Sequence, residues 1–174
     1  LAEFDMVRCN NTRKVKTPLP SDWCEGAMSE DNGTLTEPLS AEDHHLYRRI
    51  IGRLMYLACG TRFDIAYAVN RLSQYLAKPY VEHMKAVKHL LRYLRGANVV
   101  KLRYYRRKRI DSKPRPFEEA DDEVQFSYGL LTGYSDAEYA NTPGARSTTG
   151  WMFTLAGGPA CWSSRRQTVV AQST

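Results

Sequence analysis

A run of cations in the middle of the chain carries the first candidate site. Between Met84 and Ile110 there are ten Lys or Arg residues and no Asp or Glu. Four of them recur every three or four residues, so they share one face of a predicted helix: Lys85, Lys88, Arg92 and Arg95. Such a face can neutralise phosphates, which predicts salt-dependent binding of nucleic acid. Charged faces are also ordinary on exposed helices, so a solvated helix surface is an equally good interpretation.

A second candidate is the carboxylate of Asp136, the acid within a predicted strand that lies inside residues 125–138. From residue type alone, a strand carboxylate near a turn is the better interpretation. Glu138 follows two residues later and therefore lies on the same face of the strand. It could help to hold a metal, but an exposed acid beside the turn is the favoured interpretation. Arg165 and Arg166 could contact substrate or form a plain surface pair.

Three predicted helices precede this strand. Ser40 with Asp43 three residues later predicts a capping box, and Gly60 ends the first helix. Thr61 and Asp64 predict a second capped start, with apolar positions at 65, 69, 72 and 76. A third helix is predicted over residues 81–96. The first helix has its predicted inward positions at 46, 50, 51, 54, 55 and 58, and the third at 84, 87, 91 and 94. One apolar face on each helix and short connections predict an antiparallel bundle.

The rest of the chain reads as strands and a linker. Residues 99–106 are rich in β-branched and aromatic side chains, which predicts a strand. Basic, proline-containing and acidic segments then follow without apolar periodicity, as expected of a linker. Two further strands are predicted at 148–156 and 160–164, with a turn at 141–144 and a tight hairpin turn at Gly157 and Gly158.

The C-terminal sequence resembles the ribonuclease H domain of copia-type retrotransposon Pol polyproteins. It reads GYSDAEYA at 133–140, RSTTGWMF at 146–153 and QTVVAQST at 167–174, similar to the family's GYSDADWA, STSGY and TVALST patterns. The helical part is similar to the thumb-like region that follows the polymerase palm, at YRRIIGRLMYL (47–57), TR (61–62) and RYLRG (92–96). Phe63 stands where the family has Pro, and Met84 where a Trp is usual.

The resemblance implies an α+β fold, a three-helix bundle followed by a truncated ribonuclease H-like antiparallel three-stranded sheet. It divides the chain into four parts. Residues 1–39 are an irregular end of the reverse transcriptase, and 40–97 form the thumb-like bundle. Residues 98–125 hold a strand and a charged linker, and 126–174 form a partial ribonuclease H-like domain.

The resemblance also implies a function for the parent polyprotein, namely RNA-directed DNA synthesis and Mg²⁺-dependent cleavage of RNA in RNA–DNA hybrids. Asp136 matches the first metal-binding carboxylate of the family, and the catalytic Glu would fall directly after Thr174. One carboxylate is a poor site for two Mg²⁺ ions, so we expect a fragment that is inactive and binds Mg²⁺ weakly or not at all. Whether the chain counts as an enzyme is left open. The implied partners are an RNA–DNA hybrid or other nucleic acid and the rest of the Pol polyprotein. The alternative is a non-catalytic nucleic-acid-binding module derived from a retroelement.

Composition sets the broad limits. The 174 residues are 43% hydrophobic and carry a net charge of +6, which permits a polyanionic partner. The four cysteines include no C-x-x-C pair, so reduced thiols are expected. The four histidines do not complete a zinc pattern, and His83 is expected at the surface or half-buried. The sequence contains no run of 18 apolar residues. We therefore expect no membrane partner, and an intracellular location in the cytoplasm or nucleus.

Overall fold

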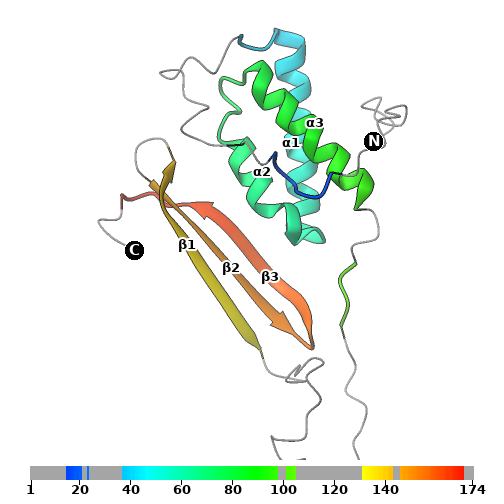
Figure 1. Ribbon diagram of the computed structural model, residues 1–174, viewed down its shortest axis with the longest axis vertical. Coiled ribbons are helices and arrows are strands. Elements are labelled where there is room, and N and C mark those ends of the chain that lie inside the picture. The colour runs from blue at the N-terminus through cyan, green and yellow to red at the C-terminus, as the bar shows by residue number, and fades with distance from the viewer. Residues whose placement is uncertain are drawn as a thin grey trace, which may run out of the picture.

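The computed structural model describes residues 15–20, 23, 37–97, 101–104, 131–142 and 146–170. They contain three α-helices, one short 3₁₀ helix and three antiparallel strands, which confirms the predicted α+β class. Figure 1 shows the helices packed together at one end, with the sheet extending away from them as a separate layer. Within the described residues, no helix is both long and apolar enough to cross a membrane.

Helix α1 spans Ala41–Gly60 and begins after the predicted cap residue, Ser40. The Ser40 hydroxyl accepts a 3.2 Å hydrogen bond from the Asp43 N–H, which satisfies one of the free donors of the first turn. The inward face is buried at Tyr47, Ile50, Ile51, Leu54 and Ala58. Met55 does not belong to this face. It is 41% exposed, because it lies about 100° around the helix from Leu54.

The predicted capping pair of Thr61 and Asp64 is wrong. A 3₁₀ helix, η5 (Phe63–Ile65), separates α1 from α2 (Ala66–Ser73), and the residue before η5 makes no side-chain cap. The Thr61 N–H instead donates to the Leu57 carbonyl at the end of α1. The Asp64 carboxylate accepts hydrogen bonds from Arg62 and Tyr93 instead of capping a helix. Helix α3 spans Val81–Gly96, the predicted bounds.

The hydrophobic core lies among the three helices. Residues from each are almost fully buried, including Ile51 of α1, Leu72 of α2 and Val87 of α3. The Tyr47 hydroxyl donates a buried 2.7 Å hydrogen bond to the Leu72 carbonyl. The four predicted inward positions of α3 are all buried. The predicted bundle packing is therefore confirmed.

The strands form a meander in the order β1-β2-β3. They span Thr132–Thr142 (β1), Arg146–Leu155 (β2) and Gly158–Arg166 (β3). The β2–β3 turn lies one residue earlier than predicted, at Ala156 and Gly157, which have φ values of 50° and 76°. Gly158 pairs with Leu155 instead. A Cβ on Gly158 would collide with the Arg103 carbonyl and the Tyr104 ring, so glycine is needed there for close approach.

Strand β3 is the strand that packs most closely on the helices, with contacts to α2 and η5. The Trp162 ring meets Phe63 edge-on, with 5.9 Å between centroids. Arg166 donates a 3.3 Å hydrogen bond to the Gln74 side chain just after α2. Of the predicted strand 99–106, the described residues 101–104 have no strand assignment, and the others lie outside the described residues. The four-part domain division stays a prediction.

Candidate functional site

Asp136 lies in the middle of β1, opposite Gly150 of β2. Gly150 in turn pairs with Ser164 of β3. The Asp136 side chain is exposed. Its Oδ1 accepts a 2.8 Å hydrogen bond from the N–H of the next residue, Ala137, which restricts the carboxylate's orientation. The strand pairing and this hydrogen bond therefore hold the Asp136 carboxylate in one position on the sheet.

The face of the sheet that carries Asp136 is the one that faces the helices. Glu138 marks it, because its Oε2 lies 3.5 Å from the Tyr67 hydroxyl of α2. Thr148, which pairs with Glu138, accepts a 3.4 Å hydrogen bond from buried Arg71. Since alternate residues share a face, Asp136 and Gly150 lie on this inner face as well. The prediction that Glu138 shares the face of Asp136 is confirmed.

A groove of about 390 Å³ lies between this inner face and the start of α2, and we call it the helix–sheet groove. Phe63 and Tyr67 form its helical wall. Trp162 lines it from β3, the strand that contacts the helices, and Asp136 and Glu138 line it from the edge strand β1. The groove thus combines aromatic rings with two carboxylates.

Arg71 is the unexpected charge beside this groove, because its side chain is fully buried. Its guanidinium lies 5.8 Å from the centre of the Tyr67 ring, a cation–π distance. Burial lowers the pKa of Arg71, opposed by the attraction of Tyr75 and Glu138. Burial, with the neighbouring Glu138 carboxylate, raises the pKa of the Tyr67 hydroxyl. The phenol therefore stays protonated and available to donate to Glu138.

The donor set of the groove only partly suits a metal. Carboxylate oxygens are the ligands that Mg²⁺ prefers. Within the described residues, however, no group of three or more His, Cys, Asp or Glu side chains converges. Asp136 and Glu138 are two carboxylates, and one Asp136 oxygen already accepts a backbone hydrogen bond. These residues alone do not fit a two-metal site, so we derive no metal-dependent step for this chain.

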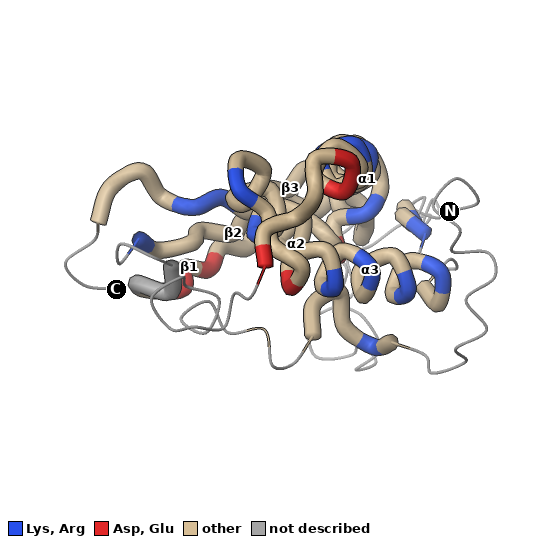
Figure 2. Tube along the Cα trace, turned by 90° about the horizontal axis from the view of Figure 1, so that it is seen from above, with Lys and Arg blue, Asp and Glu red and all other residues tan. Residues whose placement is uncertain are grey.

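The four cations predicted on α3 are all exposed: Lys85, Lys88, Arg92 and Arg95. Figure 2 shows blue segments recurring along α3. Lys85 also pairs loosely with Glu82 at 3.8 Å. A second groove, lined in part by Trp23, Lys85 and Arg92, borders this face. His89 contributes to it and bonds the Thr17 carbonyl at 3.0 Å.

The other two predicted cations lie on the sheet. Arg165 is exposed, whereas Arg166 is half-buried against Gln74. The structure brings Arg166 and Asp136 onto the same inner face of the sheet, by their pairing through Thr148 and Gly150. The helix–sheet groove and the groove beside α3 have no lining residue in common. The candidate carboxylate and the cations of α3 thus belong to separate surfaces.

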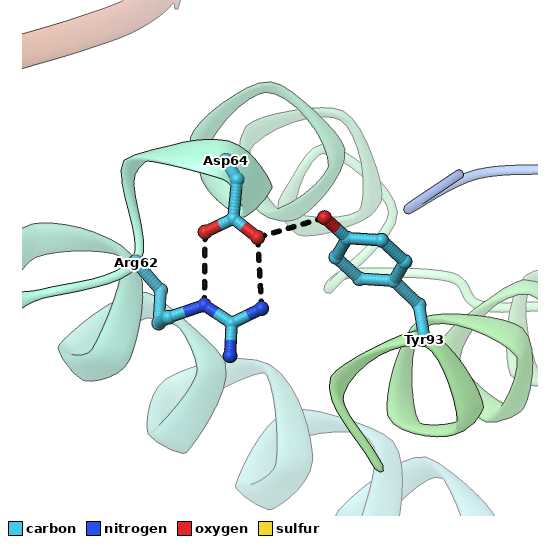
Figure 3. A network of polar contacts seen from close by, with 3 residues as sticks. All are labelled: Arg62, Asp64 and Tyr93. Atoms are coloured by element: carbon cyan, nitrogen blue, oxygen red, sulfur yellow. Dashed lines mark hydrogen bonds and ion pairs between the residues drawn. The ribbon is translucent and has the colours of Figure 1, made fainter. Parts of the chain in front are cut away.

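Sequence reasoning missed a polar network that joins η5 to α3 (Figure 3). Arg62 holds Asp64 with two hydrogen bonds of 2.9 and 2.8 Å, and the Tyr93 hydroxyl donates to Asp64 at 2.9 Å. Burial alone would raise the pKa of Asp64, but the hydrogen bonds from Arg62 and Tyr93 outweigh it and lower that pKa. The two-residue spacing of Arg62 and Asp64 was the available signal for this ion pair.

His83 was predicted to be at the surface or half-buried, and this is wrong. The imidazole is fully buried and stacks on Tyr75 with 3.9 Å between ring centroids. Its Nδ1 accepts a 2.9 Å hydrogen bond from the Tyr80 N–H at the start of α3. Burial lowers the pKa of His83 to about 4, with Glu82 acting in the opposite direction. His83 is therefore neutral at pH 7 and has a structural position.

Comparison with known proteins gives the chain a family. The Retrovirus-related Pol polyprotein from transposon TNT 1-94 of Nicotiana tabacum is 33% identical over 100% of this chain, which covers 11% of that protein. The corresponding protein from transposon RE1 of Arabidopsis thaliana is 33% identical over 99% of this chain and 10% of its own length. Secreted RxLR effector protein 161 of Plasmopara viticola is 35% identical over 73% of this chain and 77% of that protein. No protein-family model and no solved structure matches the chain.

The chain belongs to the family of retrovirus-related Pol polyproteins of transposons. It spans about a tenth of the length of the Pol polyproteins that it matches.

Proposed function

We propose that the chain is the thumb-like and partial ribonuclease H region of a copia-type Pol polyprotein. The parent would carry out RNA-directed DNA synthesis and Mg²⁺-dependent cleavage of RNA in RNA–DNA hybrids, inside the cell in the cytoplasm or nucleus. One observation carries the proposal. Asp136 stands exposed at the centre of the first strand of an antiparallel meander, in a chain that aligns along its whole length with transposon Pol polyproteins.

In this proposal Asp136 is one carboxylate of a site that other parts of the polyprotein complete. Asp136 would help to hold Mg²⁺ there, and the chemistry supplied by the metal would be activation of water and stabilisation of the leaving oxygen. This chain's own contribution is to fix the Asp136 carboxylate through the sheet and the Ala137 N–H. Because the described residues supply only two carboxylates to the groove, Asp136 and Glu138, we propose that the chain by itself cleaves no nucleic acid.

The test compares the chain alone with a fusion that adds the segment following the matched region in one of the Pol relatives. We expect Mg²⁺-dependent cleavage of the RNA strand of a hybrid by the fusion only. Asp136→Asn should lower that cleavage by at least about 10²-fold, since a metal ligand is lost. Glu138→Gln, the neighbour on the same face, is the matched control and should retain most activity. Cleavage by the chain alone that Asp136→Asn abolishes would contradict its inactivity. An active fusion that tolerates Asp136→Asn would contradict the site.

A second function, a non-catalytic nucleic-acid-binding module, is favoured by α3. Its four predicted cations are all exposed, and the inward face of the same helix is buried in the core. The match to Secreted RxLR effector protein 161, which covers 77% of that protein, shows that a related region makes up most of a protein not named as a Pol polyprotein. The matched region can therefore occur in a protein apart from a polymerase, as a separate binding module would.

Salt-dependent binding tests this second function. Fluorescence anisotropy with a labelled RNA–DNA hybrid should give an affinity that falls steeply with salt, with a slope of about −2 to −4 for two to four phosphate contacts. Charge reversal at Lys88 and Arg92 should weaken binding and reduce the magnitude of the slope by about 2. Reversal at Arg49 and Arg53, exposed cations of α1, changes net charge equally and is the matched control. Equal losses in both variants, or no binding at low salt, would exclude a site on α3.

A further inference from the structure

The helix–sheet groove has a chemical character that RNA cleavage does not explain. Among the described residues, the charged side chains that line it are both acids, Asp136 and Glu138, although the whole chain carries a net charge of +6. Its walls include the rings of Phe63, Tyr67 and Trp162. The faces of aromatic rings are electron-rich and attract cations. Rings and carboxylates together therefore favour a cationic occupant that also presents apolar surface.

The aromatic rings and the carboxylates line different sides of the groove, so a small cation inside it could contact both. Trp162 lies on the side where β3 packs against the helices, and its ring is held edge-on to Phe63. The acids stand on the edge strand β1, where Tyr134 also lines the groove and is 58% exposed. A cation entering at β1 would meet the carboxylates first and then the rings. At about 390 Å³, the groove is within the size range of small-ligand pockets.

The structure already contains this kind of contact beside the groove. The Arg71 guanidinium lies 5.8 Å from the centre of the Tyr67 ring. Arg71 is fully buried and does not line the groove, and neither does Arg166, which bonds Gln74. Arg71 donates to Thr148 and Arg166 pairs with it, so both meet the sheet at the row of Glu138, two residues along β1 from Asp136. The more favourable position for a further cation is therefore beside Asp136.

Gly150 supplies an independent observation. It occupies the central strand opposite Asp136. Glycine weakens a strand interior and often marks a point where a ligand approaches the backbone. Among the residues that the structure describes, none requires glycine here, because an added Cβ would meet no atom of them closer than the Ser163 carbonyl at 4.0 Å. Since Gly150 shares the inner face with Asp136, a side chain there would project into the groove.

We propose that the helix–sheet groove binds an organic cation that carries a guanidinium or alkylammonium group. The cation would lie over Gly150, between the aromatic rings and the Asp136 carboxylate. The carboxylate accepts hydrogen bonds from the cation, and the rings contact its apolar and π surfaces. The proposal does not rest on the function proposed above, because it requires neither nucleic acid nor Mg²⁺.

The test is a ¹H–¹⁵N NMR titration of the whole chain with N-acetylarginine amide. N-acetylcitrulline amide is the matched probe, because it has nearly the same shape without the charge. We expect saturable shifts at the amides of Asp136 and Gly150 in the millimolar range. Citrulline should bind at least about tenfold more weakly, since both the cation–π and the carboxylate contacts need the charge.

Variants separate the groove from general electrostatics. Gly150→Val fills the groove while raising strand propensity, and should abolish binding without loss of stability. Ala137→Val adds the same β-branched group next to Asp136 on the opposite face and should bind normally. Asp136→Asn should bind at least about fivefold more weakly, because a charge-assisted hydrogen bond is lost. Equal binding of citrulline, unchanged binding in Gly150→Val, or displacement of arginine amide by an equal concentration of Mg²⁺ would overturn the proposal.

Discussion

The indole N–H of Trp162, in β3, donates a 2.6 Å hydrogen bond to the carbonyl oxygen of Ala58, in the last turn of α1. The last carbonyls of a helix have no partner within the helix. The Thr61 and Arg62 N–H groups both donate to Leu57, one residue earlier. A side chain of the sheet therefore satisfies a carbonyl that the helix leaves open, and joins the bundle to the sheet.

Removing this hydrogen bond should weaken the fold measurably. Trp162→Phe keeps an aromatic ring against Phe63 but leaves the Ala58 carbonyl without its donor, so the free energy of unfolding should fall by about 1 kcal/mol. Trp162→Ala also loses the ring packing and should cost about 2–3 kcal/mol. Urea unfolding followed by circular dichroism measures both. Trp151→Phe, on the outer face of β2, is the control and should stay within about 0.5 kcal/mol. Equal effects of the two Phe substitutions would contradict a special role for Trp162.

The bundle should be the more stable part of the chain. The buried hydrophobic cluster consists of helical residues of α1, η5, α2 and α3. In contrast, Asp136 and its neighbours along β1 are exposed, and β1 is the edge of the described sheet. Amide hydrogen exchange should therefore be at least about 10²-fold slower in α1 and α3 than in β1, because few buried contacts oppose local opening of the strand. Strand amides as protected as those at Ile51 or Val87 would show that this is wrong.

The helices were predictable because local signals agree with their packing. Ser40 provides a side-chain cap at the start of α1, and glycines end α1 and α3. Apolar spacing identified four buried positions of α3, at 84, 87, 91 and 94, but not Ala86 or Leu90. The signals failed where two elements meet. Asp64 has the spacing of a capping residue, but Arg62 and Tyr93 offer its carboxylate stronger partners. Gly158 was predicted to be a turn residue, but glycine is needed there because a side chain would collide with Tyr104.

The site was only partly predictable, because its walls come from distant parts of the sequence. Period-two alternation placed Asp136 and Glu138 on one face of β1. No local pattern could pair Trp162 with Ala58, which is 104 residues away. The burial of Arg71 was equally hidden, since a charged residue in an amphipathic helix is expected at the surface. It is buried because the sheet covers it and Thr148 accepts from its guanidinium.

The Asp64 network should contribute stability that disappears in acid. The pKa of Asp64 in the folded chain lies below its ordinary value of 3.8. The carboxylate's contribution is therefore complete above that value and is lost as the pH falls through the lower folded pKa. Tyr93→Phe removes one donor to Asp64 and should reduce the free energy of unfolding by about 1 kcal/mol at pH 7.

Urea unfolding at pH 7 and pH 3 checks this prediction for Tyr93. The difference between wild type and Tyr93→Phe should shrink at pH 3, as protonation of Asp64 begins. Tyr56→Phe is the matched control, because Tyr56 is 82% exposed and should show no effect at either pH. A Tyr93→Phe effect that is the same at both pH values would mean that the hydroxyl acts independently of the Asp64 charge.

His83 should make the stability of the chain depend on pH as well, at higher pH values than Asp64 does. Its pKa is about 4 in the folded chain, against an ordinary value of 6.5. Between these values the unfolded chain binds a proton that the folded chain does not, so stability falls as the pH drops from 6.5 towards 4. The loss should be on the order of 2–3 kcal/mol. Protonation would also remove the Nδ1 acceptor that receives the Tyr80 N–H at the start of α3.

His83→Gln isolates this effect. Glutamine at the third position of a helix can still accept from the backbone N–H at its start, but it does not titrate. The variant should be less stable at pH 7, because the stacking on Tyr75 is lost, yet its stability should change less between pH 7 and pH 5 than that of the wild type. Thermal unfolding at both pH values gives the comparison, with exposed His45→Gln as the control. If the wild type and His83→Gln lose the same stability over this range, the buried imidazole does not cause the acid sensitivity.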